Sequence, residues 1–109
     1  WAIKKIKQFE QRGVSRNNLI FDPGIGFGKT AIHSLEIIRR INEFEELGVK
    51  ILAGHSEKSF LKLFTNEPAG KRNVETNAIT FFLAANKVDY VRVHNVQEAR
   101  RSIIMVGSL

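Results

Sequence analysis

The sequence contains no cysteine, and this absence excludes disulfide bonds, thiolate nucleophiles and thiolate metal ligands. It also lacks any run near the roughly 18 consecutive apolar residues that a membrane-spanning helix needs. The first residues do not show the charged, apolar and small-residue regions of a secretory signal. We therefore expect a cytoplasmic protein that does not enter a membrane. Any metal chemistry would have to use oxygen or imidazole ligands.

Acidic residues are scarcer than basic ones, since 11 Asp and Glu stand against 17 Lys and Arg and give a formal net charge of +6. This balance admits nucleic acid, anionic membranes and phosphorylated small molecules as partners. The basic residues are nevertheless interspersed with acidic ones, as in Glu36, Arg39, Arg40, Glu43, Glu45 and Glu46. Such mixing is typical of a solvated helix face, so we do not expect nucleic-acid binding.

One modest hydrophobic core is expected from 109 residues of which 43% are hydrophobic. Apolar periodicity and the glycine and proline stops predict a helix, followed by strand and helix three times over. The predicted helices cover residues 1–12, 31–47, 59–64, 76–86 and the stretch after Asn95, and the predicted strands cover 19–21, 49–53 and 90–93. This alternation favours parallel strands joined by right-handed crossovers.

Three charged residues each follow a predicted strand at nearly equal intervals. Asp22 and Lys58 are 36 residues apart, and Lys58 and Arg92 are 34 residues apart. Each interval matches one strand-helix-strand unit of roughly 30 or more residues. Parallel strands bring their carboxyl ends to one edge of a sheet, where barrel and open-sheet enzymes place their chemistry. We therefore expect the three side chains to converge.

The glycine-rich stretch from Asp22 to Thr30 runs from a strand through Gly-Lys-Thr into a helix, as a phosphate-binding loop does. A Walker A loop requires a glycine five positions before the Gly-Lys pair, and Pro23 occupies that place. Proline has a fixed φ and no amide hydrogen for a phosphate. A phosphate-loop NTPase is therefore the weakest of the alternatives.

Three blocks of the sequence together resemble the signature blocks of dihydropteroate synthases. They are Asp-Pro-Gly-Ile-Gly-Phe-Gly-Lys at 22–29, Gly-His-Ser-Glu-Lys-Ser-Phe at 54–60 and Arg-Val-His at 92–94. The resemblance implies an α/β fold in which residues 1–109 are the C-terminal fragment of a (β/α)8 TIM barrel of about 250 residues. The rest of the barrel would precede this chain and carry the ligand for Mg2+. A homodimer is also expected, on the resemblance alone.

The resemblance implies a transferase of folate biosynthesis. It would condense p-aminobenzoate with a 7,8-dihydropterin carrying a CH2-diphosphate, and so give 7,8-dihydropteroate and diphosphate. The implied catalytic residues are Lys58 and Arg92, and the isolated fragment is expected to be inactive. The residues implied for pterin binding are Asp22, Gly26, Lys58 and Arg92; those for p-aminobenzoate are Phe27 and Ser56; those for diphosphate are Arg92 and His94. None of these residues is expected to bind a metal.

The sequence also departs from the family's pattern, because Glu57 stands where an arginine usually follows the serine. If the Glu57 carboxylate faces the diphosphate, we expect activity to suffer. The main alternative is therefore a non-catalytic fragment that keeps a pterin or anion pocket. Asn95 replaces the usual aspartate after the histidine, but we expect it to cap the last helix as aspartate would.

Overall fold

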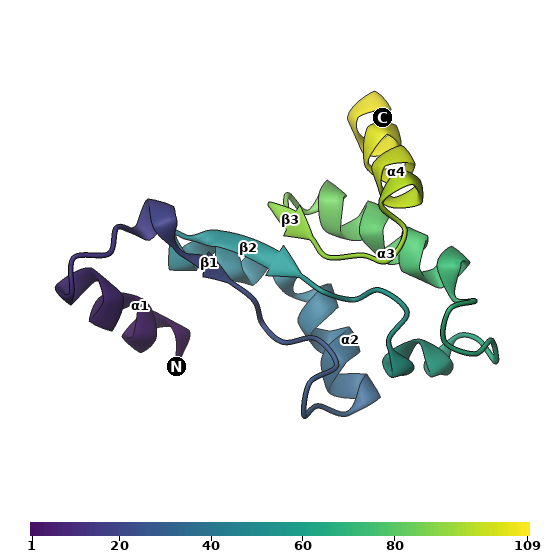
Figure 1. The fold of residues 1–109 in the computed structure, drawn as a ribbon, viewed down its shortest axis with the longest axis horizontal. Coiled ribbons are helices and arrows are strands. Elements are labelled where there is room, and N and C mark those ends of the chain that lie inside the picture. Colours follow the sequence, from purple (N-terminus) through teal and green to yellow (C-terminus); the bar gives the residue numbers. More distant parts are fainter.

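The computed structural model describes all residues from 1 to 109 as a three-stranded parallel sheet with helices around it (Figure 1). In chain order the elements are α1 (Ala2–Gln11), the short 3-10 helix η1 (Arg16–Asn18), β1 (Ile20–Phe21), α2 (Ala31–Arg39), η2 (Ile41–Leu47), β2 (Lys50–Ala53), η3 (Ser59–Leu63), α3 (Asn73–Ala85), β3 (Tyr90–Val91) and α4 (Val96–Ser108). The predicted order of elements is therefore confirmed. None of the helices is long and apolar enough to cross a membrane.

The sheet has the strand order β1-β2-β3, and both neighbouring pairs are parallel. Ile20 lies opposite Lys50 in the first pair, and Ala53 lies opposite Val91 in the second. Beyond β3, the Arg92 amide still donates to the Ala53 carbonyl over 2.9 Å. The strands are shorter than predicted, yet their carboxyl ends share one edge, and the residues after β1, β2 and β3 are thereby placed side by side.

The single helix predicted over residues 31–47 is wrong, because the chain leaves the α-helix at Arg40 and continues as the 3-10 helix η2. A 3-10 helix has three residues per turn, so the three-residue spacing of Ile41, Phe44 and Leu47 places them on one face. Phe44 packs against Phe21 with ring centroids 5.1 Å apart. The spacing that suggested one long helix is thus better matched by the tighter turn.

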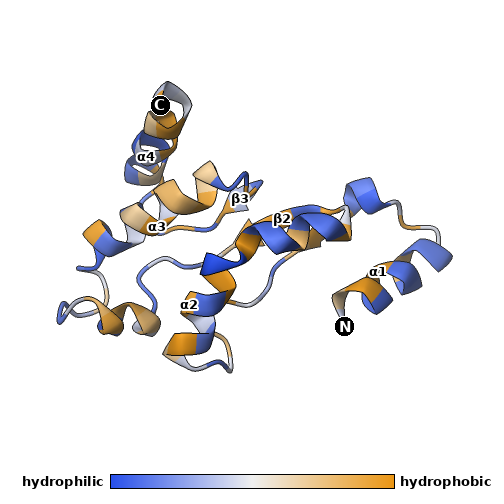
Figure 2. Ribbon diagram, turned by 180° about the vertical axis from the view of Figure 1, so that it is seen from behind, coloured by the Kyte–Doolittle hydropathy of each residue, from blue (hydrophilic) through white to orange (hydrophobic).

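The core lies between the sheet, the inner faces of α2 and α3, and the first turns of η3. Its buried members are Ile25, Ile38, Ile41, Ile51, Ala53, Phe60, Leu61 and Leu83. Figure 2 shows α3 as hydrophobic along most of its C-terminal half. Only part of that surface is covered within the chain, because Leu83 is buried whereas Phe82 is exposed. The helix predicted over residues 76–86 is confirmed as α3, but only one face of it is buried within the chain.

The chain forms an elongated body with α1 at one end and α4 at the other (Figure 1). Its radius of gyration is 14.8 Å, compared with about 13 Å for a compact domain of this length. An apolar hollow of about 260 Å³ separates α1 from β1 and is lined by residues that include Trp1, Ile6, Phe9 and Ile20. Considerable apolar surface therefore faces outward along the β1 edge.

Candidate functional site

Asp22 and Arg92 meet at the edge formed by the carboxyl ends of the strands. Arg92 Nη1 lies 3.3 Å from Asp22 Oδ2, although the residues are 70 positions apart. The other Asp22 oxygen accepts a hydrogen bond from the Gly24 amide over 2.8 Å, which stabilises the turn after Pro23. Asp22 is therefore both a turn residue and a partner of the arginine. Gly54 makes room for this pair, since a Cβ there would overlap the Arg92 guanidinium.

Lys58 lies against the glycine-rich loop. Its Nζ donates to the Ile25 carbonyl and sits 4.1 Å from the centre of the Phe27 ring. The loop can approach this closely because a Cβ on Gly26 would lie 2.7 Å from Lys58 Cδ. Burial is the first cause that lowers the pKa of the Lys58 ammonium, and repulsion by Arg92 is the second. This cation is thus held partly desolvated beside a second one, which favours a negatively charged ligand.

The glycine-rich loop is held by hydrogen bonds with two side chains, those of Ser34 and Lys29. The Gly26 amide donates to the hydroxyl of the buried Ser34 over 3.1 Å. Lys29 Nζ donates to the Gly24 and Phe27 carbonyls over 3.1 and 3.2 Å. Lys29 therefore closes its own loop, unlike the lysine of a phosphate-binding loop, which reaches for the nucleotide.

Ser56 and His94 form a second contact between strand ends. Ser56 Oγ lies 2.8 Å from His94 Nδ1 and also accepts a hydrogen bond from the His94 amide over 3.1 Å. With the hydroxyl engaged on Nδ1, the imidazole Nε2 is free of any partner within the chain. The pair can therefore offer one polar nitrogen to a ligand.

A small cavity of about 150 Å³ connects these groups, and its lining includes Ser56, Lys58, Arg92 and His94. A larger one of about 710 Å³ opens beside it and is lined in part by Ser56, Lys58, Gly70 and His94. The remaining predicted site residues adjoin this edge, because Asp22 pairs with Arg92 while Gly26 and Phe27 contact Lys58. All seven predicted positions are thus brought together. Their roles remain predictions.

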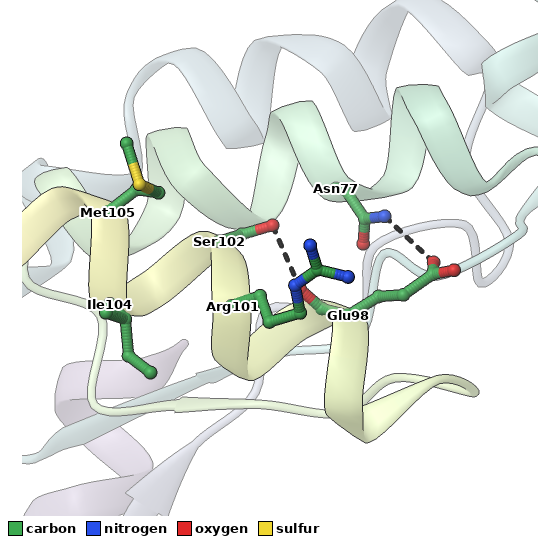
Figure 3. A pocket seen from close by; sticks show the side chains of 6 residues that line it. All are labelled: Asn77, Glu98, Arg101, Ser102, Ile104 and Met105. Carbon is green, nitrogen blue, oxygen red and sulfur yellow. Dashed lines mark hydrogen bonds between the residues drawn. The ribbon is translucent and has the colours of Figure 1, made fainter.

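A different hollow, between α3 and α4, contains none of the predicted site residues (Figure 3). Asn77 Nδ2 donates to Glu98 Oε2 over 3.0 Å across it, and Ser102 donates to the Glu98 carbonyl over 3.1 Å. Asn95 caps α4 by accepting from the Glu98 amide over 3.0 Å, as expected. Of these contacts, the one between Asn77 and Glu98 joins α3 to α4, whereas the other two lie within α4 and its cap.

Activity is expected to suffer if the Glu57 carboxylate faces the diphosphate. In the structure Glu57 Oε2 accepts hydrogen bonds from the Gly70 and Arg72 amides, over 3.0 and 2.9 Å. The carboxylate is directed toward the loop before α3. The negative charge is therefore taken up by backbone amides.

His55 is a buried residue that the sequence did not single out. Its Nε2 lies 2.8 Å from Thr80 Oγ1 and 3.2 Å from the Thr76 carbonyl, and its Nδ1 is buried without a partner. The Thr76 carbonyl can only accept, so we assign the proton to Nε2. Burial, as the main cause, lowers the pKa of His55 to about 4. His55 therefore stays neutral and ties the end of β2 to α3.

No three His, Asp or Glu side chains gather in a way that could hold a metal ion.

The sequence profile of the family described as pterin binding enzyme matches residues 1–94. The chain belongs to the pterin-binding enzyme family. Among similar members, the dihydropteroate synthase of Clostridium beijerinckii is 43% identical over 94 residues, which cover 85% of this chain and 35% of that protein. A folate synthesis bifunctional protein of Chlamydia caviae is 39% identical over 101 residues, covering 93% of this chain and 23% of that protein.

Solved structures of pterin-binding enzymes share the fold. The dihydropteroate synthase of Anaplasma phagocytophilum, with bound 6-hydroxymethylpterin-monophosphate, matches with a TM-score of 0.91 and 33% identity. The match covers 98% of this chain and 43% of that one. The predicted fold class is therefore confirmed: the chain corresponds to part of a (β/α)8 barrel. It spans less than half the length of each of these three relatives.

Proposed function

We propose that these residues are part of a dihydropteroate synthase, which condenses p-aminobenzoate with a 7,8-dihydropterin carrying a CH2-diphosphate. The supporting observation is the convergence of Asp22, Lys58 and Arg92 from three successive strand ends. A carboxylate, an ammonium and a guanidinium at one edge suit a substrate that has a guanidine-like ring and an anionic leaving group. The names of the relatives support the same reaction.

The reaction requires a site that holds charges of both signs. As the bond between carbon and the diphosphate oxygen breaks, positive charge builds on the pterin methylene and negative charge on the leaving group, while the amine of p-aminobenzoate attacks the methylene. We assign Asp22 to the pterin's guanidine-like nitrogens, a charge-assisted contact worth about 1.5 to 3 kcal/mol. Lys58 and Gly26 would contact the pterin ring. Arg92 would stack over that ring and face the diphosphate.

The other three residues would serve the remaining groups. Phe27 is 64% exposed beside Lys58, so its ring is available to pack against p-aminobenzoate. Ser56 would lie near the carboxylate of that substrate. His94 would donate from Nε2 to the diphosphate, because its Nδ1 is engaged with Ser56. None of these residues is assigned as a general base.

Several further features rest on the resemblance. We propose that the remaining barrel strands supply the Mg2+ ligand and the other pterin contacts, and that these 109 residues alone are inactive. A homodimer is proposed on the same ground, and a cytoplasmic location is proposed from the sequence composition.

The test is an assay of diphosphate release in the full-length protein with both substrates present. We expect kcat/KM to fall by about tenfold to a hundredfold in Asp22→Asn and turnover to fall below detection in Lys58→Ala. The matched control is Lys62→Ala, because Lys62 is an exposed lysine of η3 whose ammonium makes no hydrogen bond or ion pair within the chain. Pterin binding without turnover in the unsubstituted protein would instead support a non-catalytic pterin-binding protein.

A further inference from the structure

Three consecutive residues after β2 are directed to three different segments. Ser56 bonds to His94, and Lys58 donates to the Ile25 carbonyl. Between them Glu57 has a φ of 58°, in the left-handed region. Residues other than glycine avoid this region because of crowding at Cβ, and they remain there only where surrounding contacts determine it. The contacts of Glu57 are therefore informative.

The amide, the carbonyl and one carboxylate oxygen of Glu57 all bond to the segment that leads into α3 or to the first turn of α3. Its carboxylate accepts from the Gly70 and Arg72 amides. Its own amide donates to Thr76 Oγ1 over 3.1 Å, and its carbonyl accepts from Arg72 Nη1 over 2.8 Å. Arg72 is itself buried and also donates from Nε to the Glu67 carbonyl over 2.9 Å. Glu57 thus fastens the loop of residues 65–72 to the end of β2.

This loop forms one wall of the larger cavity at the site. Ala69 and Gly70 line it together with Ser56 and His94. The loop residues from Asn66 to Gly70 are exposed, so packing contributes little to their position. This wall is therefore restrained by hydrogen bonds, namely the two from amides to Glu57 Oε2 and those of the Arg72 side chain to the Glu57 and Glu67 carbonyls.

We infer that Glu57 is a positioning residue that holds Ala69 and Gly70 against the bound p-aminobenzoate. The assignment of this ligand rests on the proposed function. The smaller cavity is lined by both Lys58 and Arg92 and suits the diphosphate, whereas the larger cavity is lined by Lys58 and Glu57 but not by Arg92 and suits a group of lower charge. The larger cavity is thus left to the aromatic acid.

This inference opposes what the family pattern suggests. On the pattern alone, Glu57→Arg would restore the usual residue and improve activity. In this structure a guanidinium cannot accept hydrogen bonds from the Gly70 and Arg72 amides, and it would add a cation beside the buried Arg72. Glu57→Arg should therefore release the loop and weaken p-aminobenzoate binding.

The experiment uses the full-length protein and two measurements. Hydrogen exchange reports the protection of the Gly70 and Arg72 amides, and steady-state kinetics give KM for each substrate. In Glu57→Arg and Glu57→Ala we expect protection to fall about tenfold or more, and KM for p-aminobenzoate to rise about tenfold, because two bonds to a charged acceptor are lost. KM for the dihydropterin diphosphate should change by less than about threefold, since Lys58 keeps its own anchor at Ile25. Glu57→Gln, which keeps an oxygen acceptor, should recover most of both losses.

The matched control is Glu67→Gln, because Glu67 is an exposed acid on the same loop whose carboxylate makes no hydrogen bond. It should leave both measurements unchanged. Unaltered protection in Glu57→Ala would overturn the inference, as would lost protection with an unchanged KM for p-aminobenzoate. A protein that does not condense the two substrates at all would contradict the proposed function, while the exchange measurement would still test the restraint of the loop by Glu57.

Discussion

Arg92 Nη1 lies 3.3 Å from the carboxylate oxygen Oδ2 of Asp22, which is 70 residues earlier in the chain. Both side chains are substantially exposed, at 55% for Arg92 and 36% for Asp22. Exposed ion pairs contribute only about 0 to 1 kcal/mol to stability. Placing opposite charges at the ends of β1 and β3 therefore matters for a ligand more than for folding.

Asp22→Asn should separate binding from stability. We expect kcat/KM to fall by about tenfold to a hundredfold, because a charge-assisted contact to the pterin is lost. The midpoint of urea unfolding should change little. Steady-state kinetics and urea titration of the full-length protein check this.

The control for Asp22→Asn is Glu36→Gln, since Glu36 is also an exposed acid near an arginine, with 3.8 Å between its carboxylate and Arg39. Glu36→Gln should change neither kcat/KM nor the midpoint of urea unfolding. If Asp22→Asn unfolds the protein and leaves the kcat/KM of the folded fraction intact, Asp22 acts as a turn residue only.

Gly26→Ala and Gly28→Ala form a matched pair in the glycine-rich loop. Both glycines have positive φ, 83° and 61°, so alanine costs each backbone about 1 to 2 kcal/mol. Only at Gly26 would the new Cβ meet Lys58, 2.7 Å from Cδ, whereas Gly28 has nothing within 4 Å. We expect similar losses in unfolding free energy but a loss of about tenfold or more in kcat/KM for Gly26→Ala alone. Equal kinetic effects would show that the contact with Lys58 has no role.

His55 should make the protein less stable in mild acid. Its pKa is about 4 when folded, below the ordinary value of 6.5, so the unfolded chain binds the proton first as pH falls. The stabilisation is complete above pH 6.5 and is lost between pH 6.5 and 4, with a total of roughly 3 kcal/mol. Urea unfolding from pH 7 to pH 4 measures this loss. The unfolding free energy should decrease less steeply from pH 7 to pH 4 in His55→Gln than in the unsubstituted protein. In His33→Gln, which alters an exposed histidine, this pH dependence should be unchanged. An identical slope in both variants would contradict the burial of His55.

The 109 residues produced alone should self-associate. β1 pairs on one side only, and the neighbouring apolar hollow is open. Unpaired strand edges of this kind pair with strands of other chains, and a lysine on the edge strand opposes this association. Sedimentation at micromolar concentration should show association that is reduced by Ile20→Lys on β1. Ile32→Lys on α2 should leave it unchanged, because Ile32 is equally exposed but lies away from the strand edge. A monodisperse monomer with cooperative unfolding would contradict this prediction.

The parts of the fold that follow from local pattern were predictable from the sequence. Turn residues marked the ends of the strands, and the spacing of Asp22, Lys58 and Arg92 indicated one shared edge because parallel strands repeat at a regular interval. The cap at Asn95 also followed from its residue type. These signals depend on neighbours in the chain.

The features that depend on distant contacts were not predictable. The direction of Glu57 is determined by Gly70 and Arg72, and the neutrality of His55 by Thr76 and Thr80, all of which join the site only after folding. The break at Arg40 was missed because a three-residue spacing fits both an α-helix face and a 3-10 helix over a short stretch.

A crystal structure of the full-length protein with 6-hydroxymethylpterin monophosphate tests the proposed site most directly. The ring should lie between Lys58 and Arg92, with the Asp22 carboxylate within hydrogen-bond distance of its ring nitrogens and the phosphate toward His94. A pterin bound elsewhere, for example in the hollow between α3 and α4, would contradict the assignment of these strand ends as the substrate site.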